Sequence, residues 1–468
     1  MLQLLSQSER EKIHQTGKMI LGEIGVTVHD TTVYNLLLEA GALCDKNNPE
    51  RLYFPSDMIE KYLPLCPKSF TIKDRMGNVV DVKNGARSLY YTANGTHFVR
   101  GTSKKAVDIG EKEFIDFTRV ADKLENIDGI VGTSIIDYVP AMRDMAGFRL
   151  MAQNSYKHLR PCIYTPAGAE AIIEMAGVIL EGSPLSENMF FTLGYSIVSP
   201  LVWAPTALQL FYRTKGHKIP MMINSEPMGG ATSPVTLAGS LAMADAEVIS
   251  GIIINQVIEP GRPCIYNAGF AHVMDMMSAN ALTGSPENAL LQAAGAEMAA
   301  YHNLPCASWA LSDSAMLDAQ ASYEKMNTYM AHTVSGVNIV WGAGNLEASK
   351  TICPESAVID NEIIGCCKRF AQGIQVDDEH IAYHVIKEAS LDGSFLESEH
   401  TLEYYRRQIR HSKLPNRQPR RLWDGKGSLS LEEKAGNIVN DILSKKPEQY
   451  LTGTQMDKLK QIENSYSN

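Results

Sequence analysis

Short apolar runs recur along the middle of the chain, and each is followed by a stretch with helical periodicity. Successive runs are roughly 30 to 45 residues apart, which is the spacing expected of β/α units. They occupy residues 88–92, 129–135, 161–165, 190–196, 220–225, 263–269, 305–310 and 337–342. Eight successive parallel units predict an α/β fold closed into a (β/α)8 TIM barrel, and we place this domain at residues 86–375.

The alternative is an open, doubly wound sheet. We prefer the barrel because no G-x-G-x-x-G sequence follows the first run. Four runs begin with proline, which is tolerated at the first position of a strand and so marks its entry end. Small and polar residues mark the carboxyl ends, where barrels build their active sites: Thr92, Ser134, Thr165, Ser196, Asn224, Asn267 and Ser312.

The regions on either side of the predicted barrel have different patterns. Residues 1–85 have helical periodicity at 8–23, 31–40 and 55–63 and strand alternation at 70–82, which predicts a small α/β cap ending in a hairpin. Residues 376–468 lack strand patterns and predict helices at 380–389, 402–410, 431–443 and 455–462. We expect this C-terminal helical extension to pack against the barrel or a second subunit, and we expect a homo-oligomer.

Residues 225–239 join an apolar run to a long apolar-periodic segment. Gly229 and Gly230 permit positive φ and close backbone approach, Ser233 is suited to capping a helix, and Pro234 suits the first helical position. We therefore expect a helix to begin at Pro234, with free N–H groups that face a carboxylate or phosphate. An ordinary βα loop is the alternative.

Composition narrows the class of partner and the location. The formal charge is −10 and the pI about 5.7, which argues against nucleic acid as a partner. The basic run at 406–421 is the exception, and we interpret it as a solvated connection or a docking patch for an acidic partner. Eight scattered cysteines without C-x-x-C fit reduced thiols. With neither a signal-peptide pattern nor about 18 consecutive apolar residues, we expect a cytoplasmic protein without membrane contact.

Three segments together resemble a known family. The run SEPMGGATSPVTLAGSLAMADAEVISGI at 225–252, with SPLVW at 199–203 and LSDSAMLDAQASYEK at 311–325, is similar to the trimethylamine methyltransferase superfamily. The resemblance extends over nearly the whole chain. The archaeal trimethylamine enzymes of that superfamily carry pyrrolysine, whereas this sequence has only the standard residues. It therefore resembles the non-pyrrolysine branch, whose characterised members demethylate quaternary amines such as glycine betaine.

The resemblance implies that the methyl group passes to the Co(I) of a separate corrinoid protein. A quaternary ammonium departs as a neutral amine, so the chain needs no catalytic nucleophile or acid and its work is positioning and water exclusion. We expect no cofactor bound tightly on this chain, with cobalamin carried by the partner. The usual corrinoid-ligand motif D-x-H-x-x-G has its nearest match at Asp378-Glu379-His380, where Tyr383 replaces the glycine.

A betaine needs aromatic faces for its cation and donors for its carboxylate. Cation–π attraction is worth up to about 2 kcal/mol when desolvated. Aromatic candidates at strand ends are Tyr91 (or Tyr90, since only one can face inward), Tyr195, Tyr266, Trp309 and Trp341. For the carboxylate we expect the turn with Asn224, Gly229 and Gly230, helped by Asn94, His97 and Asn267; Glu226 and Asp313 orient donors or stabilise the cation. For each residue alone, core packing or loop capping is the alternative.

Other chemistries remain as alternatives. Some corrinoid methyltransferases use zinc, but Cys and His show no ligand-like spacing here, so we expect no metal site. A non-catalytic barrel that binds a betaine or a phosphorylated metabolite differs from an enzyme in the access at its mouth, as an enzyme must admit a corrinoid domain. A corrinoid methyltransferase for another methyl donor is a third possibility. Glycine betaine, proline betaine, carnitine and γ-butyrobetaine share the head group and all belong to the predicted substrate class.

Overall fold

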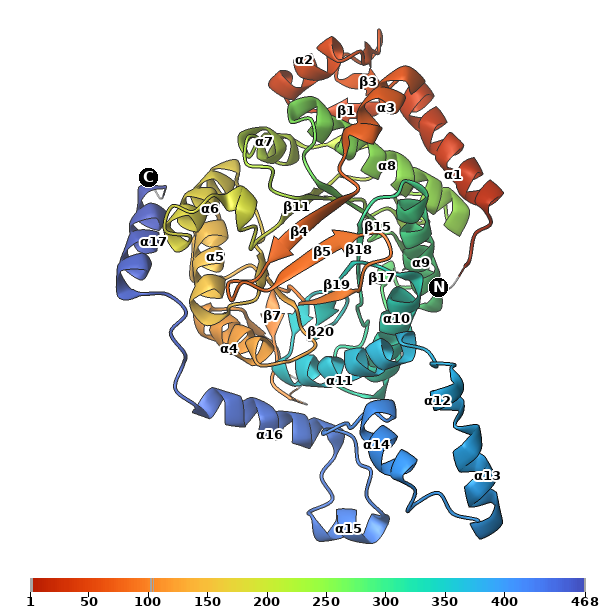
Figure 1. The fold of residues 1–468 in the computed structure, drawn as a ribbon. Helices are drawn as coiled ribbons and strands as arrows, with labels where there is room; N and C mark the ends of the chain where they lie inside the picture. Colours follow the sequence, from red (N-terminus) through yellow and green to blue (C-terminus); the bar gives the residue numbers. More distant parts are fainter. Residues whose placement is uncertain (1–2, 102, 104, 467–468) are drawn as a thin grey trace.

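A closed parallel barrel forms the centre of the molecule (Figure 1). The computed structural model describes residues 3–101, 103 and 105–466. Strand order around the sheet is β10-β9-β6-β19-β18-β15-β13-β11. Phe190 and Leu159 close it, since Leu159 N donates to Phe190 O at 2.9 Å. The strands are β6 (Leu89–Thr92), β9 (Gly129–Val131), β10 (His158–Arg160), β11 (Leu193–Ser196), β13 (Met221–Asn224), β15 (Cys264–Gly269), β18 (Cys306–Trp309) and β19 (Ile339–Ala343). The predicted TIM barrel is confirmed.

Each strand is followed by a helix of the outer ring. The helices are α4 (Glu111–Asp122), α5 (Arg143–Asn154), α6 (Pro166–Ile179), α7 (Pro205–Arg213), α8 (Leu237–Ile258), α9 (Pro286–Tyr301), α10 (Ala319–Ser335) and α11 (Pro354–Ala371). Seven of the predicted strands overlap the observed ones; the third was wrong, because the strand lies at His158–Arg160 and not at 161–165. Pro161 follows this strand instead of opening it. The strand escaped detection because the barrel interior accepts its polar His158 and Arg160.

Helix α8 is the most apolar long helix of the ring. By length and composition it could cross a membrane, but 83% of its apolar window is buried inside the molecule, as in the core helix of a globular protein. It begins at Leu237, so the prediction of a start at Pro234 was wrong. Ser233 does not cap the helix. Its hydroxyl instead lies 2.7 Å from the Ser240 hydroxyl, which donates to Pro234 O.

The N-terminal block packs on the outside of the barrel. It contains α1 (Gln7–Met19), a π-helical turn (Ile20–Ile24), β1 (Val26–Val28), α2 (Thr31–Glu39), β2 (Leu43–Cys44), β3 (Arg51–Tyr53), α3 (Ser56–Tyr62), a 3-10 turn (Leu63–Leu65), β4 (Ser69–Lys73) and β5 (Val79–Lys83). Helix α1 lies along α8, and β1 pairs in parallel with β12 (Val202–Trp203) of the barrel. The predicted helices and the hairpin are present.

The β4–β5 hairpin crosses the amino-terminal end of the barrel (Figure 1). Lys73 N donates to Met189 O at 2.8 Å, and the Asn338 side chain donates to Lys83 O at 2.7 Å. Both contacted residues precede barrel strands. Ile72 and Val82 are buried in one cluster with interior side chains, among them Leu89, Tyr91, Met222, Ile265 and Ile339. The hairpin therefore covers the end of the barrel opposite the one where active sites are built.

Two small sheets surround the carboxyl ends of the barrel strands, which we call the mouth. One consists of β7 (His97–Phe98), β8 (Val107–Asp108), β20 (Asn345–Leu346) and β21 (Thr351–Ile352). The other consists of β14 (Met228–Gly229), β16 (His272–Asp275) and β17 (Asn280–Leu282). Because β14 and β16 pair in parallel, the loops that follow β13 and β15 lie side by side.

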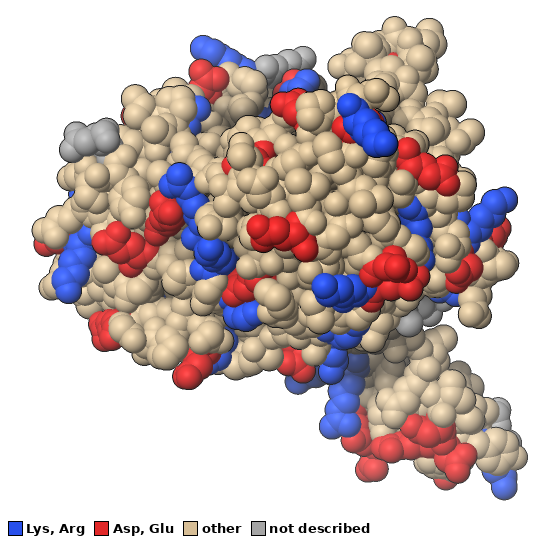
Figure 2. Space-filling model, turned by 90° about the horizontal axis from the view of Figure 1, so that it is seen from above, with Lys and Arg blue, Asp and Glu red and all other residues tan. Residues whose placement is uncertain are grey.

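The C-terminal extension is helical, as predicted. It comprises α12 (Asp378–Ile381), α13 (Tyr383–Asp392), α14 (Glu399–Gln408), α15 (Arg420–Gly425), α16 (Leu431–Ser444) and α17 (Gly453–Ser465). Helices α12 to α15 project away from the barrel, whereas α16 packs on α11 and α4, and α17 packs on α6 (Figure 1). The domain boundaries at residues 85 and 375 stay a prediction. On the face shown in Figure 2, acidic and basic side chains are interspersed.

Candidate functional site

An aromatic cluster lies at the mouth. It consists of Phe270, His272, Trp309 and Trp341, which come from the ends of β18 and β19 and from the segment after β15. The Phe270 and Trp309 rings are stacked with centroids 4.4 Å apart, and Trp341 meets Phe270 edge-on at 5.2 Å. Trp309 and Trp341 are register partners on neighbouring parallel strands, so their side chains leave the sheet on the same side.

Polar atoms of this region are buried without protein partners. Within the described residues, the indole N–H groups of Trp309 and Trp341, the Asn267 carbonyl oxygen and Arg160 Nε have no hydrogen-bond partner. Buried polar atoms are normally satisfied, so several orphans in one place indicate water or a ligand. Donors outnumber acceptors in this set. The mouth therefore offers apolar rings together with free N–H groups, which is how small-molecule sites are built.

Arg160 supplies the positive charge of this site. Its guanidinium lies 4.8 Å above the Trp341 ring, and its Nη2 donates to Gly194 O at 3.0 Å. Burial lowers the pKa of Arg160 to about 10, which leaves it a cation at neutral pH. The Arg160 charge can therefore attract a carboxylate beside the aromatic cluster.

Two asparagines and one glutamate follow β13 and β15. Asn224 and Asn267 are register partners, and the Asn267 amide donates to Asn224 Oδ1 at 2.9 Å. Glu226 is partly buried and makes no hydrogen bond or ion pair with any described residue, and burial raises its pKa to about 7. It stands two residues before Met228, which pairs with His272 of the aromatic cluster. Near neutral pH Glu226 is thus able to carry or lose a negative charge close to the rings.

A buried acid joins two of the three segments that carry the resemblance. Glu247 of α8 accepts hydrogen bonds from Ser199 Oγ, Ser225 Oγ and Leu201 N, at 2.6 to 2.8 Å. It thereby ties the SPLVW loop to the start of the turn at 225–239. Burial raises the pKa of Glu247, and these three donors oppose that rise. The signature residues therefore hold the loops that shape one side of the mouth.

The glycine turn after β13 is held together by hydrogen bonds between its own backbone groups. Met228 O accepts from the N–H groups of Ala231, Thr232 and Ser233, and Gly230 N donates to Ser233 O at 3.0 Å. Gly230 has a φ of 96°, a conformation that glycine adopts without strain. Because several N–H groups of the turn already have partners, its predicted role in binding a carboxylate stays a prediction.

Some of the predicted aromatic residues lie away from the mouth. Tyr195 follows Gly194, which faces inward, so the Tyr195 side chain points outward. It forms a hydrogen bond with Thr206 of α7. The Tyr266 hydroxyl donates to Asp245 on α8 at 2.7 Å, outside the barrel. Tyr91 does face the interior, but its hydroxyl lies 2.8 Å from His158 Nδ1 and its ring belongs to the cluster beneath the hairpin. We therefore remove Tyr195 and Tyr266 from the candidate site, because strand alternation turns both rings toward the helices.

Three of the predicted polar residues contact other residues of the loops and short strands around the mouth. His97 lies in β7 with 41% of its side chain exposed, 3.7 Å from Asp108. Asn94 Oδ1 accepts from Ser349 Oγ at 3.0 Å. Asp313 accepts from Thr283 N and Oγ1 and from Gly284 N, which is the loop-capping alternative. Only Asn94 directly follows a barrel strand at the mouth.

The sequence did not point to Phe270, His272 or Arg160. Phe270 and His272 follow β15 in NAGFAH, where a run of small residues ends in large ones, and this change was the available signal. Arg160 was missed because the third strand was placed three residues too late.

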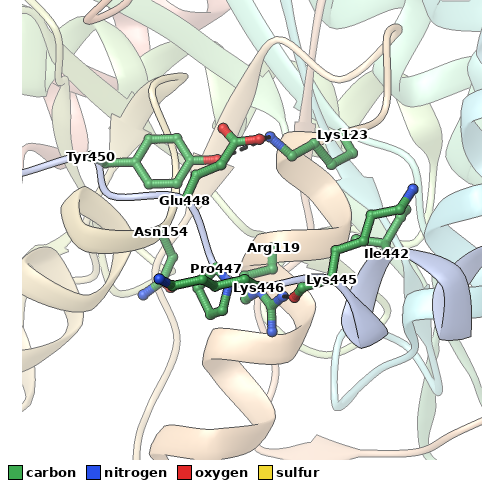
Figure 3. A pocket seen from close by; sticks show the side chains of 9 residues that line it. All are labelled: Arg119, Lys123, Asn154, Ile442, Lys445, Lys446, Pro447, Glu448 and Tyr450. Atoms are coloured by element: carbon green, nitrogen blue, oxygen red, sulfur yellow. Dashed lines mark hydrogen bonds and ion pairs between the residues drawn. The ribbon is translucent and has the colours of Figure 1, made fainter.

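A surface pocket of about 380 Å³ lies elsewhere, between α4 and the segment that joins α16 to α17 (Figure 3). Three of its basic side chains, Arg119, Lys123 and Lys445, already have partners. Lys123 contacts Glu448 at 2.8 Å and Asp122 at 3.1 Å, and Arg119 donates to Lys445 O at 2.7 Å. The contacts around this pocket therefore fasten the C-terminal extension to α4. The mouth remains the candidate site.

The fold and the mouth define a class, the TIM barrels with an aromatic and polar site at the carboxyl ends of their strands. Comparison with known proteins makes the assignment particular: the family of trimethylamine methyltransferases matches residues 1–463, and the chain belongs to it.

Similar proteins include the trimethylamine methyltransferase MttB of Desulfitobacterium hafniense, 27% identical over 94% of this chain and 88% of the relative. The glycine betaine methyltransferase of the same species is 28% identical over 94% and 92%. MttB of Methanosarcina barkeri is 29% identical over 94% and 90%. Among solved structures, the monomethylamine methyltransferase MtmB of Methanosarcina barkeri aligns with a TM-score of 0.54 at 13% identity over 96% of this chain and 92% of that one, and it supports the fold.

Proposed function

We propose that this protein removes a methyl group from a quaternary amine, glycine betaine or a related betaine, and transfers it to the cobalt of a separate corrinoid protein. Family membership supports a methyltransferase acting on methylated amines, and relatives named for trimethylamine and for glycine betaine are similarly distant. The observation that carries the choice of a quaternary amine is the aromatic cluster around Trp309 and Phe270.

The chain's own residues have separate tasks in this proposal. The trimethylammonium group lies against the exposed part of the Trp309 ring, where attraction to the ring quadrupole replaces hydration. Glu226, when ionised, adds a negative charge near the cation. The amine nitrogen leaves neutral and needs no proton. The residues therefore bind, orient and exclude water, and none of them forms a bond to the methyl group.

The substrate carboxylate faces donors on the other side of the cluster. Arg160 Nε and the indole N–H groups of Trp309 and Trp341 are buried donors without partners among the described residues. A charge-assisted hydrogen bond to a guanidinium is stronger than a neutral one. Cation and anion of a betaine are separated by one or a few carbons, so a site with a ring face and an adjacent arginine suits a zwitterion.

The corrinoid belongs to a partner in this proposal, and it supplies the nucleophilic cobalt that accepts the methyl group. His380, the nearest match to a lower ligand, lies in α12 on the projecting part of the extension. Its Nδ1 lies 2.7 Å from Asp377 Oδ1. Tyr383 stands where the corrinoid-ligand motif has glycine, so the motif is incomplete and we assign the corrinoid to the partner.

We further propose a cytoplasmic homo-oligomer. The extension and the residues just before it expose large apolar side chains: Ile374 is 90% exposed, Leu396 81% and Val376 74%. We propose that a second copy of the chain covers these side chains, because another copy is present wherever the protein is. Light scattering should give a mass above that of one chain, and a monomeric mass contradicts this part of the proposal.

The test of the function is spectroscopic. The purified protein is mixed under strictly anaerobic conditions with cob(I)alamin, and then with a reduced corrinoid protein, and candidate amines are added singly. Loss of the Co(I) absorption on addition of a betaine supports the proposal, and trimethylamine at equal concentration is the comparison. If only trimethylamine reacts, the quaternary assignment is wrong. If no amine reacts but betaines bind, the barrel is a binding protein or acts on another donor.

A further inference from the structure

Three residues far apart in the sequence meet outside the barrel. His14 lies on α1, Asp245 on α8, and His302 immediately after α9. His14 Nδ1 lies 3.4 Å from one Asp245 oxygen, and His302 Nε2 lies 3.0 Å from the other. Within the part of the chain that the structure describes, this is the one group of three such side chains close enough to share a metal ion, with ligand atoms within 4.8 Å of one another.

The environment of the group is closed. The side chain of Asp245 is 0% exposed, that of His302 4% and that of His14 12%. Gly17 of α1 faces the carboxylate, and a Cβ atom there would lie 2.9 Å from Asp245 Oδ2. A glycine at this position therefore lets the N-terminal helix approach closely enough for His14 to reach Asp245.

We propose that His14, Asp245 and His302 form a binding site for a divalent transition metal, with zinc as the ion that fits best. Zinc binds imidazole nitrogen and carboxylate oxygen at about 2.0 to 2.2 Å, so ligand atoms around a tetrahedral ion lie about 3.4 Å apart. The distances from Asp245 to both histidines are already close to this value. Two imidazoles disfavour calcium and magnesium, which prefer oxygen ligands.

A neighbouring hydroxyl orients the carboxylate. Tyr266 donates to Asp245 Oδ1 at 2.7 Å, and such a hydrogen bond fixes the direction of a metal-binding carboxylate. The same tyrosine was expected to contact substrate, and this contact gives its side chain a different purpose. The three ligands come from α1, from α8 and from the residue that follows α9. A bound ion would therefore fasten the N-terminal block to the barrel.

The sequence could not show this site, because His14 and Asp245 are 231 residues apart and Asp245 and His302 are 57 apart. The expectation of no metal site rested on spacing alone. The site stands apart from the mouth and is independent of the proposed function.

The experiment measures metal binding directly on the full chain. The protein is stripped with a chelator, exchanged into chelator-free buffer, and titrated with Zn²⁺ in competition with a chromophoric chelator; Co²⁺ is titrated separately by its visible absorption. We expect one ion per chain, and at least a tenfold loss of Zn²⁺ affinity in His14→Gln and in Asp245→Asn. His29→Gln is the matched control, because His29 lies in the same block but pairs with Glu50 at 3.6 Å.

A second readout keeps the test decisive where a variant folds poorly. Chelator should lower the melting temperature of the wild type and of His29→Gln, and it should leave that of His14→Gln unchanged. His14 is the most exposed ligand, so its replacement is the best tolerated. The proposal is overturned if the wild type binds neither Zn²⁺ nor Co²⁺, or if His14→Gln retains wild-type affinity; the group is then a hydrogen-bonded His-Asp-His cluster only.

Discussion

Trp309 combines two properties in one side chain. One side of its ring is stacked on Phe270, while its N–H has no partner among the described residues. In Trp309→Ala the affinity for a trimethylammonium compound should fall by about thirtyfold, because a desolvated cation–π contact is worth about 2 kcal/mol. A neutral analogue with carbon in place of nitrogen should lose far less. Calorimetric titration of both ligands measures the difference.

Tyr195→Phe provides the matched control for Trp309, because the ring of Tyr195 faces the helix layer and should be indifferent to either ligand. Equal losses of the charged and neutral ligands in Trp309→Ala would mean that Trp309 only fills space.

Glu226 makes the mouth sensitive to pH. Burial raises its pKa to about 7, so the carboxyl is neutral below that pH and negative above it. The affinity for tetramethylammonium, which has no carboxylate of its own, should therefore rise by about tenfold between pH 6 and pH 8. Glu226→Gln should flatten this profile, and a profile that keeps its rise in the variant assigns the titration to another group.

The same raised pKa has an opposite effect on folding. The folded protein holds the Glu226 proton more tightly than the unfolded chain, so this contribution to stability is present at low pH and is lost as the pH rises through about 7. Binding of a cation and stability of the fold thus depend on pH with opposite signs at this one residue.

A site residue could be predicted from the sequence only where it came at the end of a recognisable strand and its side chain also faced the barrel interior. Trp309 and Trp341 come at the ends of clearly apolar strands, and both reach the mouth. Tyr195 and Tyr266 come from equally clear strands but face outward, since a strand pattern that is apolar on both faces does not reveal its inward side. Arg160 escaped because a polar interior residue breaks the apolar signal.

At the scale of elements, a change in the turn at 228–233 should alter the shape of the mouth without changing the stability of the barrel. Gly230 has a φ of 96°, and valine in that conformation is strained by about 1 to 3 kcal/mol. Gly230→Val should weaken betaine binding while the main thermal transition persists, because the strands and α8 do not depend on the turn. Gly216→Val is the control: it has a φ of 90° and open space around it, and it lies before β13, away from the mouth. Loss of the thermal transition in Gly230→Val alone would make the turn structural.

Helices and strands followed from periodicity, and their ends did not. The start of α8 was placed at Pro234 because Ser233 and Pro234 form a common helix-start pattern, yet the Ser233 hydroxyl bonds Ser240 and the helix begins at Leu237. A side-chain contact seven residues away decided this end, and such a contact is invisible to a local pattern.

At the scale of the whole molecule, the regular succession of eight β/α units was enough to predict a closed barrel. The lateral contacts were not predictable in the same way. The pairing of β1 with β12 and the packing of α1 on α8 join segments far apart in the chain, and nothing in their local sequence names the partner.

Within the described residues, the β4–β5 hairpin and the packed side chains next to it cover the amino-terminal end of the barrel, which leaves the mouth as the route to the candidate site. Under the proposed function, amine and methyl acceptor both reach the site through the mouth, so a corrinoid protein docked there would enclose the amine and keep the demethylated product from leaving. Transfer should accordingly follow a compulsory order, amine first and corrinoid protein second, with release in reverse. Initial-rate product inhibition measures this: the demethylated amine should compete with the amine substrate, and excess corrinoid protein should slow turnover by trapping the product.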